Sequence, residues 1–262
     1  MPEDRDYAVV TGAGSGIGRA VAMELSKEPL TVLAVGRRSQ ALEETAALAA
    51  GKGKVVTASA DVTSDNGRLA ILDKLSGASR VKYLVHAAGI LPIERLTNIT
   101  AESWRRVMTT NVDARLLLTQ ALIPKLRNGG RVLFIGSMSA TKPRKGSAAY
   151  CTAMAASFML HQCLKLELAP YAIQVTSAVP GPVNTIMIQN SLAADADVFP
   201  DSAEYAVLRE QGKLIEPRRV GQFYRWLLTH TDDETYSAGQ WDIRDESHHK
   251  SWLGRDNLYA NA

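Results

Sequence analysis

The chain has 262 residues, of which 46% are apolar and 22% are charged, with a net charge of +3 at neutral pH. This length and composition suit one globular domain with a buried core, and they exclude collagen-like, low-complexity and disordered chains. The charge is balanced and lacks the clustered basic stripe of a nucleic-acid-binding protein, so we expect no nucleic-acid partner.

Three features of the sequence concern the compartment of the protein. Two cysteines, Cys151 and Cys163, are too few for a disulfide framework, which favours a reducing compartment. No apolar run reaches the ~18 residues of a membrane-spanning helix, and residues 1–6 lack the apolar segment of a signal peptide. We therefore expect a cytoplasmic protein that is neither secreted nor inserted into a membrane.

Short β-rich runs alternate with helical patterns along the whole chain. Strands are expected over 7–11, 30–35, 54–60, 81–86, 131–135, 173–178 and 240–243, and helices after the first strand to about 26, then over 39–50, after Ser64, and over 101–126, 150–168 and 219–228. Continuous apolar strands separated by helices indicate a doubly wound parallel sheet with helices on both faces. No linker divides the chain, so the sequence predicts one α/β domain over residues 1–262. Its least regular stretch, 180–217, is expected to form a substrate-binding lid.

A glycine-rich turn joins the first expected strand to the first expected helix. It reads Thr11-Gly12-Ala13-Gly14-Ser15-Gly16-Ile17-Gly18. Glycines let the backbone approach a pyrophosphate, which would lie at the positive end of the helix dipole. The alternative is a plain turn, but its place at the first strand-to-helix junction favours a dinucleotide site.

Two arginines, Arg37 and Arg38, follow the second expected strand. A site for NAD normally has an acidic residue there to bind the ribose hydroxyls. Guanidinium groups could instead hold a 2′-phosphate, although a solvated basic turn is the alternative interpretation. We therefore expect NADP(H) to be favoured over NAD(H).

Several further motifs occur in a recognisable order. They are Asp61-Val62, His86-Ala87-Ala88-Gly89, Asn111-Val112, Ser137, Tyr150 and Pro180-Gly181-Pro182-Val183-Asn184-Thr185. Together with the glycine-rich turn they resemble the short-chain dehydrogenase/reductase family over nearly the whole chain, with His86 in place of the family's first asparagine. The resemblance implies a Rossmann fold with a seven-stranded sheet.

The same resemblance implies roles for individual residues. Ser137 would bind the carbonyl oxygen, Tyr150 would deliver the proton and also contact the cofactor, and Asn111 would hold the fourth helix in register. Cofactor contacts are implied for Gly12, Gly14, Ser15, Gly16, Ile17, Gly18, Arg37, Arg38, Asp61, Val62, Ala87, Ala88, Gly89, Pro180, Gly181, Val183 and Thr185.

The end of the chain narrows the resemblance. The run 237–245, together with Tyr150-Cys151 and the run 165–168, resembles sepiapterin-reductase and benzil-reductase-like members, which reduce vicinal dicarbonyls or related ketones. This implies a small-molecule carbonyl substrate. The family also implies a homodimer or homotetramer formed through the helices 101–126 and 150–168, whose apolar residues fit either a core or an interface. Those residues are Leu116, Leu117, Leu118, Phe158, Met159 and Leu164.

Met154 departs from the family pattern of tyrosine, three residues, then lysine. Positions i and i+4 share a helix face, so Met154 stands where the lysine would hold the nicotinamide ribose and lower the pKa of Tyr150. Losing ~2 units of that pKa depression would remove about 3 kcal/mol of tyrosinate stabilisation. A neutral Tyr150 can still donate a proton to a ketone, whereas alcohol oxidation needs the tyrosinate.

Three interpretations of Met154 remain open. The protein is a slow or specialised reductase, a non-catalytic NADP(H)-binding regulatory or scaffold protein, or a reductase carrying an introduced substitution. The presence of Asn111, Ser137, Tyr150 and Thr185 favours a reductase.

Other candidate groups have simpler interpretations. His86 ends an expected buried strand and is expected to be structural, while the pair at 248–249 is expected to be a solvated tail. Lys142 and Lys145 are candidates to replace the missing lysine, but a solvated loop is the expected setting for both. Cysteines, histidines and acids do not cluster in the sequence, so no metal is expected.

Overall fold

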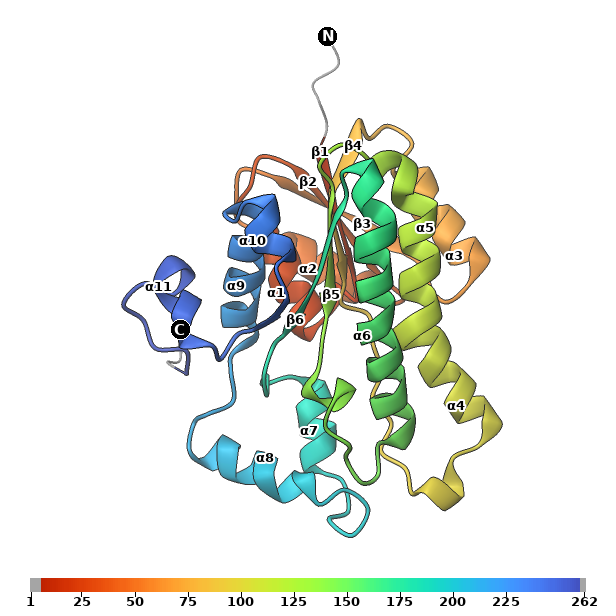
Figure 1. Ribbon diagram of the computed structural model, residues 1–262, viewed down its shortest axis with the longest axis vertical. Coiled ribbons are helices and arrows are strands. Elements are labelled where there is room, and N and C mark those ends of the chain that lie inside the picture. The colour runs from red at the N-terminus through yellow and green to blue at the C-terminus, as the bar shows by residue number, and fades with distance from the viewer. Residues whose placement is uncertain (1–5, 260–262) are drawn as a thin grey trace.

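A parallel β-sheet forms the centre of the structure (Figure 1). The computed structural model describes residues 6–259. The prediction that the chain has no signal peptide used residues 1–6, and all of these except residue 6 lie outside the described residues. The strands are β1 (Asp6–Thr11), β2 (Thr31–Gly36), β3 (Lys54–Ser59), β4 (Arg80–His86), β5 (Arg131–Ile135), β6 (Gln174–Val179) and β7 (Gln240–Asp242). Their order is β3-β2-β1-β4-β5-β6-β7, and every neighbouring pair is parallel. The predicted single α/β domain with a seven-stranded Rossmann-type sheet is confirmed.

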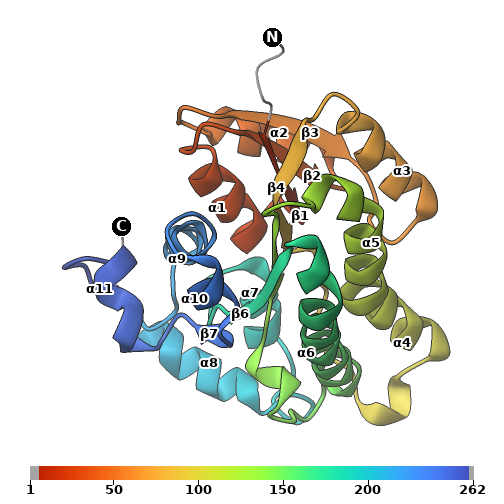
Figure 2. The same ribbon diagram turned by 45° about the horizontal axis from the view of Figure 1, so that its top comes forward.

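Helices cover both faces of this sheet. They are α1 (Gly16–Leu25), α2 (Ser39–Leu48), α3 (Asp65–Lys74), α4 (Ala101–Met108), α5 (Ala114–Leu126), α6 (Ala148–Leu168), α7 (Ile186–Leu192), α8 (Asp201–Glu210), α9 (Pro217–Thr229), α10 (Asp233–Ser237) and α11 (His249–Trp252). Figure 2 shows α1 and α9 on one face and α3, α5 and α6 on the other. Across residues 6–259 we find no helix with the length and apolarity that crossing a membrane requires.

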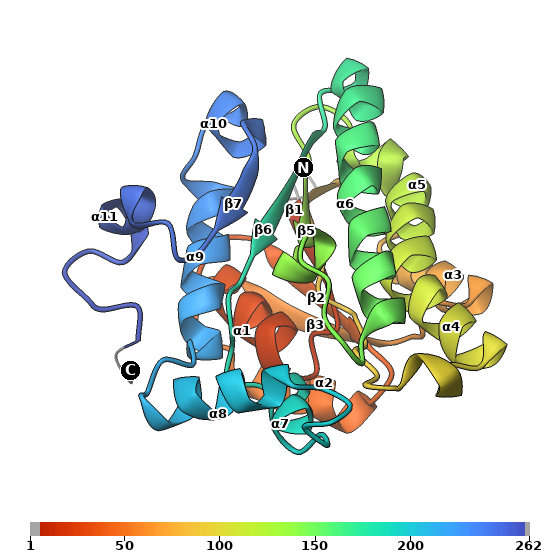
Figure 3. The same cartoon turned by 60° about the horizontal axis from the view of Figure 1, so that its bottom comes forward.

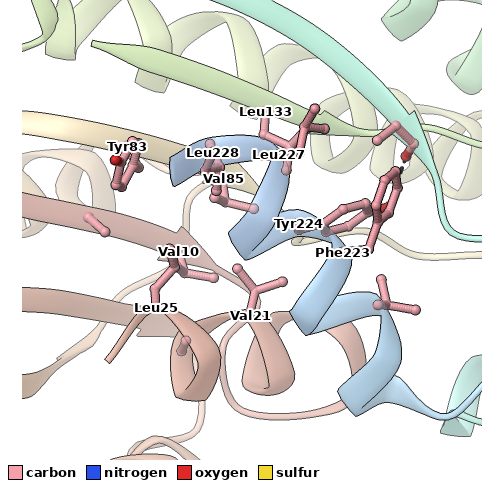
Figure 4. Packing of buried hydrophobic residues seen from close by; sticks show 14 of the residues in the cluster. Val10, Val21, Leu25, Tyr83, Val85, Leu133, Phe223, Tyr224, Leu227 and Leu228 are labelled. Carbon is pink, nitrogen blue, oxygen red and sulfur yellow. Dashed lines mark hydrogen bonds between the residues drawn. The ribbon is translucent and has the colours of Figure 1, made fainter. Parts of the chain in front are cut away.

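Alternating side chains of the strands supply two apolar cores. Ala8 and Val10 on β1 point to the face covered by α1 and α9, whereas Val9 between them points to the opposite face. Figure 4 shows the first core, where Val10 lies among side chains of α1 and α9. Within it the hydroxyl of buried Tyr224 on α9 donates to the carbonyl oxygen of Ala178 at 2.9 Å, which fixes α9 against β6.

Helices α1 and α9 lie in close contact because α9 carries a glycine at the crossing point. A Cβ added at Gly221 would lie 2.7 Å from the carbonyl oxygen of Ala20 on α1, and such a distance is a clash. Only glycine permits this approach without displacement of one helix. The position of α1 therefore depends on α9, nearly 200 residues later in the chain.

The helix predicted over 101–126 is interrupted. Between α4 and α5 the chain forms a π-helical turn over Thr109–Asp113, with Asn111 at its centre. A π turn adds one residue to the helical repeat, and such turns occur frequently at functional sites.

The predicted cap Ser64 is confirmed, since its side chain accepts a hydrogen bond from the amide of Gly67 in α3.

The prediction of a solvated histidine pair at the C-terminal end is wrong. His248 is 7% exposed and stacks on Phe223 of α9 with ring centroids 4.9 Å apart. Its Nδ1 accepts from the indole of Trp252 and its Nε2 lies 2.9 Å from the carbonyl oxygen of Asp242. The pair is held because the segment after β7 folds back onto α9, which adjacent histidines in a sequence do not reveal. Burial lowers the pKa of His248 below its ordinary value, so the ring is neutral at pH 7.

The strand order sets the place of a ligand site. The chain moves outward from β1 to β3 and then returns to place β4 on the other side of β1. In open parallel sheets, ligands bind outside the carboxyl ends of the strands at such a switch point. Figure 3 shows α7 and α8 beyond these strand ends.

Candidate functional site

One cleft at the carboxyl ends of the strands contains every residue predicted to bind cofactor or to act in catalysis. It has a volume of about 800 Å³. The predicted residues that line it are Gly12, Gly14, Ser15, Gly16, Ile17, Gly18, Arg37, Arg38, Asp61, Val62, Ala87, Ala88, Gly89, Asn111, Ser137, Tyr150, Met154, Pro180, Gly181, Val183 and Thr185. These residues come from distant parts of the chain, so the fold is what brings them together.

The glycine-rich turn forms a cradle at the start of α1. Gly12 has a φ of +66°, and a Cβ there would lie 2.8 Å from the carbonyl oxygen of Ala87, so a side chain is excluded. Ser15 precedes α1 without a capping hydrogen bond from its side chain, and the first turn holds no acidic residue. The free amides of α1 therefore open into the cleft without a protein anion to satisfy them. This arrangement fits the pyrophosphate of a dinucleotide.

Another part of the cleft lining contains the carboxylate of Asp61, which lies near Arg37, and the side chain of Arg38. Oδ1 of Asp61 accepts hydrogen bonds from the amide and the hydroxyl of Thr63 at 2.9 and 2.7 Å. Burial opposes the charge on Asp61, but these hydrogen bonds and nearby Arg37 hold its pKa below its ordinary value, so it is ionised at neutral pH. The side chains of Arg37 and Arg38 are exposed and form no hydrogen bond or ion pair within residues 6–259. Two such guanidinium groups fit a phosphate.

Side-chain hydrogen bonds fix the turn after β4. The hydroxyl oxygen of Thr11 accepts from the amides of Ala87 and Ala88 at 3.0 and 3.1 Å. Further on, Asn111 pairs with the backbone of Ile90, donating to its oxygen at 3.0 Å and accepting from its amide at 3.1 Å. The side chain of Asn111 is fully buried, whereas Ile90 is half-buried and lines the cleft. The π turn and the β4 loop are thus joined into one wall of the cleft.

Ser137 and Tyr150 occupy the centre of the cleft. Ser137 follows β5, where its Oγ accepts from the amide of Ser139 at 3.1 Å, and Tyr150 lies in the first turn of α6. Burial raises the pKa of Tyr150 above its ordinary value of 10, against the opposing effects of the Ser137 hydroxyl and the Arg115 guanidinium. The phenol is therefore protonated at neutral pH and able to donate.

Met154 follows one turn after Tyr150 and is 3% exposed. Its thioether lines the cleft and supplies neither a charge nor a strong hydrogen-bonding group. Lys142 and Lys145 are exposed and lie outside the residues that line the cleft, in line with the expected solvated setting.

Four arginines that line the cleft were not predicted, namely Arg106, Arg115, Arg144 and Arg244. Arg144 pairs with Asp201 of α8 and packs over the ring of Tyr205. Arg115 on α5 is 4% exposed. A signal for Arg115 existed, because it stands four residues after Asn111 and hence on the same helix face, at the edge of the apolar run 116–118.

His86 is structural in this geometry. Its Nε2 lies 2.8 Å from the hydroxyl of Thr119, and its ring packs against Phe134. Burial, with a smaller contribution from Arg115, lowers the pKa of His86 well below its ordinary value, so the ring is neutral. Within residues 6–259 no group of three or more histidines, cysteines or acids is placed to hold a metal ion.

The remaining walls of the cleft mix apolar and polar residues. The apolar ones include Ile90, Leu91, Met138, Met187 and Phe199, and the polar ones include Asn190, Glu204 and Lys213. The segment predicted as a lid, 180–217, contains α7 and α8 and contributes Met187, Phe199 and Tyr205 to this wall. Its closing over a substrate stays a prediction.

Comparisons with known proteins agree with this geometry. The family model described as short chain dehydrogenase matches residues 6–196. An uncharacterized oxidoreductase of Staphylococcus epidermidis is 34% identical over 188 residues, which cover 70% of this chain and 80% of that protein. Dehydrogenase/reductase SDR family member 4 of Homo sapiens is 32% identical over 246 residues, covering 91% of this chain and 86% of that protein.

A solved structure of a reductase has the same fold as this chain. The L-sorbose reductase of Gluconobacter frateurii, in complex with NADPH and L-sorbose, superposes with a TM-score of 0.80 at 25% identity, covering 91% of this chain and 95% of that one. The family match, the shared fold and the cradle at α1 lead to one conclusion. The chain belongs to the short-chain dehydrogenase/reductase family, an NAD(P)-binding family, and is an oxidoreductase of that family.

Proposed function

We propose that the protein reduces a ketone or a vicinal dicarbonyl to a hydroxy compound with NADPH as the hydride donor. The observation that carries the proposal is the pairing of Ser137 with a protonated Tyr150 at the centre of a cleft that also holds Arg37 and Arg38. The apolar and polar residues around this pair suit a medium-sized, partly apolar carbonyl compound.

Three residues of the cleft have separate roles in this reduction. Ser137 binds the carbonyl oxygen through its hydroxyl, which orients the substrate toward Tyr150. Tyr150 then donates its phenolic proton to that oxygen as negative charge develops there. NADPH, when bound, supplies the hydride. Asn111 keeps the β4 loop in place beside the reacting centre.

Met154 makes the two directions of the reaction unequal. Reduction uses the neutral phenol, the form that burial favours. Oxidation of an alcohol uses the tyrosinate, which a methionine does not stabilise. We therefore expect reduction at neutral pH and oxidation that is still rising with pH at ~10, because the pKa of Tyr150 lies above that value.

The preference for NADP(H) rests on Arg37 and Arg38. Both guanidinium groups are exposed at the rim of the cleft and are not neutralised by a carboxylate within hydrogen-bonding distance among the described residues. The likeness to an NADPH-bound L-sorbose reductase supports the same choice. The resemblance of the C-terminal run to benzil-reductase-like proteins supports vicinal dicarbonyls as the first compounds to test.

The proposal is tested by NADPH consumption with a panel of vicinal diketones and aryl ketones. The protein, Met154→Lys and Tyr150→Phe are compared. Turnover by the unmodified protein that Tyr150→Phe abolishes supports the proposal. If Met154→Lys reduces the ketones and the unmodified protein does not, the reductase site is complete except for the methionine at position 154. Tight NADPH binding without turnover by either protein would overturn the proposal and favour a regulatory or scaffold role.

We also propose that the protein forms a homodimer or homotetramer through α4, α5 and α6. Of the apolar residues predicted for core or interface, Leu118 and Leu164 belong to the core, whereas Leu116, Leu117 and Met159 are 39%, 36% and 60% exposed. Sedimentation of the protein and of Leu116→Arg tests this. A dimer or larger species that Leu116→Arg dissociates supports the proposal, and a monomeric parent protein contradicts it.

A further inference from the structure

A buried positive charge lies behind the catalytic pair. Arg115 is 4% exposed, and no carboxylate within residues 6–259 lies close enough to form an ion pair with it. A charge removed from water without a counter-ion is costly, so its retention calls for an explanation. Its Nε has no hydrogen-bond partner among the described residues.

Two hydrogen bonds place the Arg115 guanidinium between β5 and α6, and it also lies over the ring of Phe134, 5.7 Å from the centroid. One nitrogen, Nη1, donates to the carbonyl oxygen of Ile135 at 3.1 Å and to the hydroxyl of Ser157 at 2.8 Å. Ile135 ends β5, two residues before Ser137. Ser157 stands three residues after Met154, on the same face of α6. The guanidinium is therefore directed toward the face of α6 that carries Tyr150 and Met154, and it lines the same cleft.

We propose that Arg115 supplies, from α5, the positive charge beside Tyr150 that a lysine at position 154 would supply from α6. The inference deepens the proposed function and rests on it, because it assumes that Tyr150 is the proton donor. Arg115 would touch neither the substrate nor the cofactor. It is a positioning residue that acts through the phenol.

Electrostatics agree with this geometry. Burial lowers the pKa of Arg115 to about 10, while Tyr150 and Tyr224 favour its charged form, so it remains a cation at neutral pH. In turn its charge lowers the pKa of Tyr150 against the effect of burial.

The other groups around the phenol do not replace this charge. The titratable groups that act on Tyr150 are Arg115 from α5, Arg144 from the loop before α6, Cys151 from α6 and Tyr205 from α8. Arg144, which is paired with Asp201, also lowers the pKa of Tyr150, but its effect is smaller than that of Arg115. On the far side, Arg115 faces His86, which burial keeps neutral, and Tyr224. Among the cations described in the cleft, Arg115 alone is buried.

The experiment measures the ionisation of Tyr150 rather than turnover. Ultraviolet difference titration records tyrosinate formation in the protein, in Arg115→Gln and in Arg115→Lys, with the matching Tyr150→Phe spectrum subtracted from each. Arg115→Gln keeps a donor for Ile135 and Ser157 but removes the charge. Arg115→Lys keeps the charge only below the pKa of its buried amine, which burial lowers. We therefore expect Arg115→Gln to raise the pKa of Tyr150 by ~1 unit or more, and Arg115→Lys to raise it by less.

A structural role alone predicts a different result. If Arg115 only ties β5 to α6, Arg115→Gln will change stability but leave the titration of Tyr150 unmoved, and the inference is overturned. Should Arg115→Gln not fold, Arg115→Met takes its place, because a methionine fills the apolar surroundings of the side chain and carries no charge. A higher pKa of Tyr150 in Arg115→Met supports the inference, and an equal pKa overturns it.

The pH profile of alcohol oxidation gives a second readout. In Arg115→Gln, oxidation below the pKa of Tyr150 should fall about tenfold for each unit by which that pKa rises, and reduction at neutral pH should change less. Because the titration needs no substrate, the two proposals fail separately. Absence of turnover in every variant would reject the proposed reductase, while a shift of Tyr150 in Arg115→Gln would still establish the charge pairing.

Discussion

Asn111 offers a sharp test of how the cleft is built, because one side chain makes two hydrogen bonds to the backbone of Ile90. The substitution Asn111→Asp preserves the shape of the side chain and the acceptor for the amide of Ile90. It replaces the donor with a second oxygen, which then faces the carbonyl oxygen of Ile90. Since the side chain is fully buried, an ionised carboxylate there is both desolvated and repelled.

The expected penalty depends on pH. Burial and the facing carbonyl should raise the pKa of Asp at position 111 above its unfolded value of about 3.9, by ~2 units or more. Between these two pKa values the folded state then binds more protons than the unfolded state, so stability relative to the parent falls as pH rises. A shift of ~2 units costs about 2.7 kcal/mol at neutral pH. Near pH ~4 the protonated acid can donate to Ile90, and the penalty nearly vanishes.

Urea unfolding followed by circular dichroism measures this difference at several pH values between ~4 and ~7.5. Asn111→Ala is the matched control, because it loses both hydrogen bonds without gaining a charge. Its penalty should be about 1–3 kcal/mol and nearly independent of pH. If Asn111→Asp shows the same penalty at both ends of the pH range, a hydrogen bond donated by the buried Asn111 side chain to the carbonyl oxygen of Ile90 is refuted.

Three further predictions concern the cofactor, the phenol and a buried histidine. Replacing Arg37 and Arg38 by Glu should weaken NADPH binding by about 10- to 100-fold and change NADH binding much less; equal losses in fluorescence titrations would contradict the NADP assignment. Tyr150→Phe should slow ketone reduction by about 10²- to 10⁴-fold while weakening NADPH binding far less, and comparable losses would remove Tyr150 from the role of proton donor. Burial lowers the pKa of His161 to about 4, so stability should be lost as pH falls from ~6.5 toward 4, by up to about 3 kcal/mol. In His161→Gln that part of the pH dependence should be missing, and an unchanged slope in urea unfolding would contradict the burial argument.

The strands of the sheet could be predicted from the sequence because short, contiguous residue patterns mark each of them. Each strand is an apolar run bounded by a turn, and each junction carries residues that favour the turn, such as the glycines from Gly12 to Gly18. The candidate site was predictable for a related reason, since parallel strands bring their carboxyl ends to one edge of the sheet. Residues that follow β1, β4, β5 and β6 therefore meet, although they are far apart in the chain, and the resemblance of their motifs to the family had identified them.

Other features depended on contacts between distant segments. The π turn around Asn111 follows from its pairing with Ile90, and helical periodicity does not encode that pairing. His248 is buried because the chain after β7 returns to α9, where Phe223 provides a flat apolar surface. Arg115 was not singled out from the sequence, although its spacing from Asn111 places both on one helix face, and only the packing of α5 against the end of β5 and the middle of α6 shows that it is enclosed.

The close crossing of α1 and α9 at Gly221 also bears on the dynamics of the protein. The amides that would hold a pyrophosphate belong to the start of α1, and α1 keeps its position only while α9 remains packed on it. A bound dinucleotide adds free energy to the folded state alone, so it disfavours every opening that releases α1. Cofactor binding near the beginning of the chain should therefore slow hydrogen exchange in α9, near its end, without touching α9 at all.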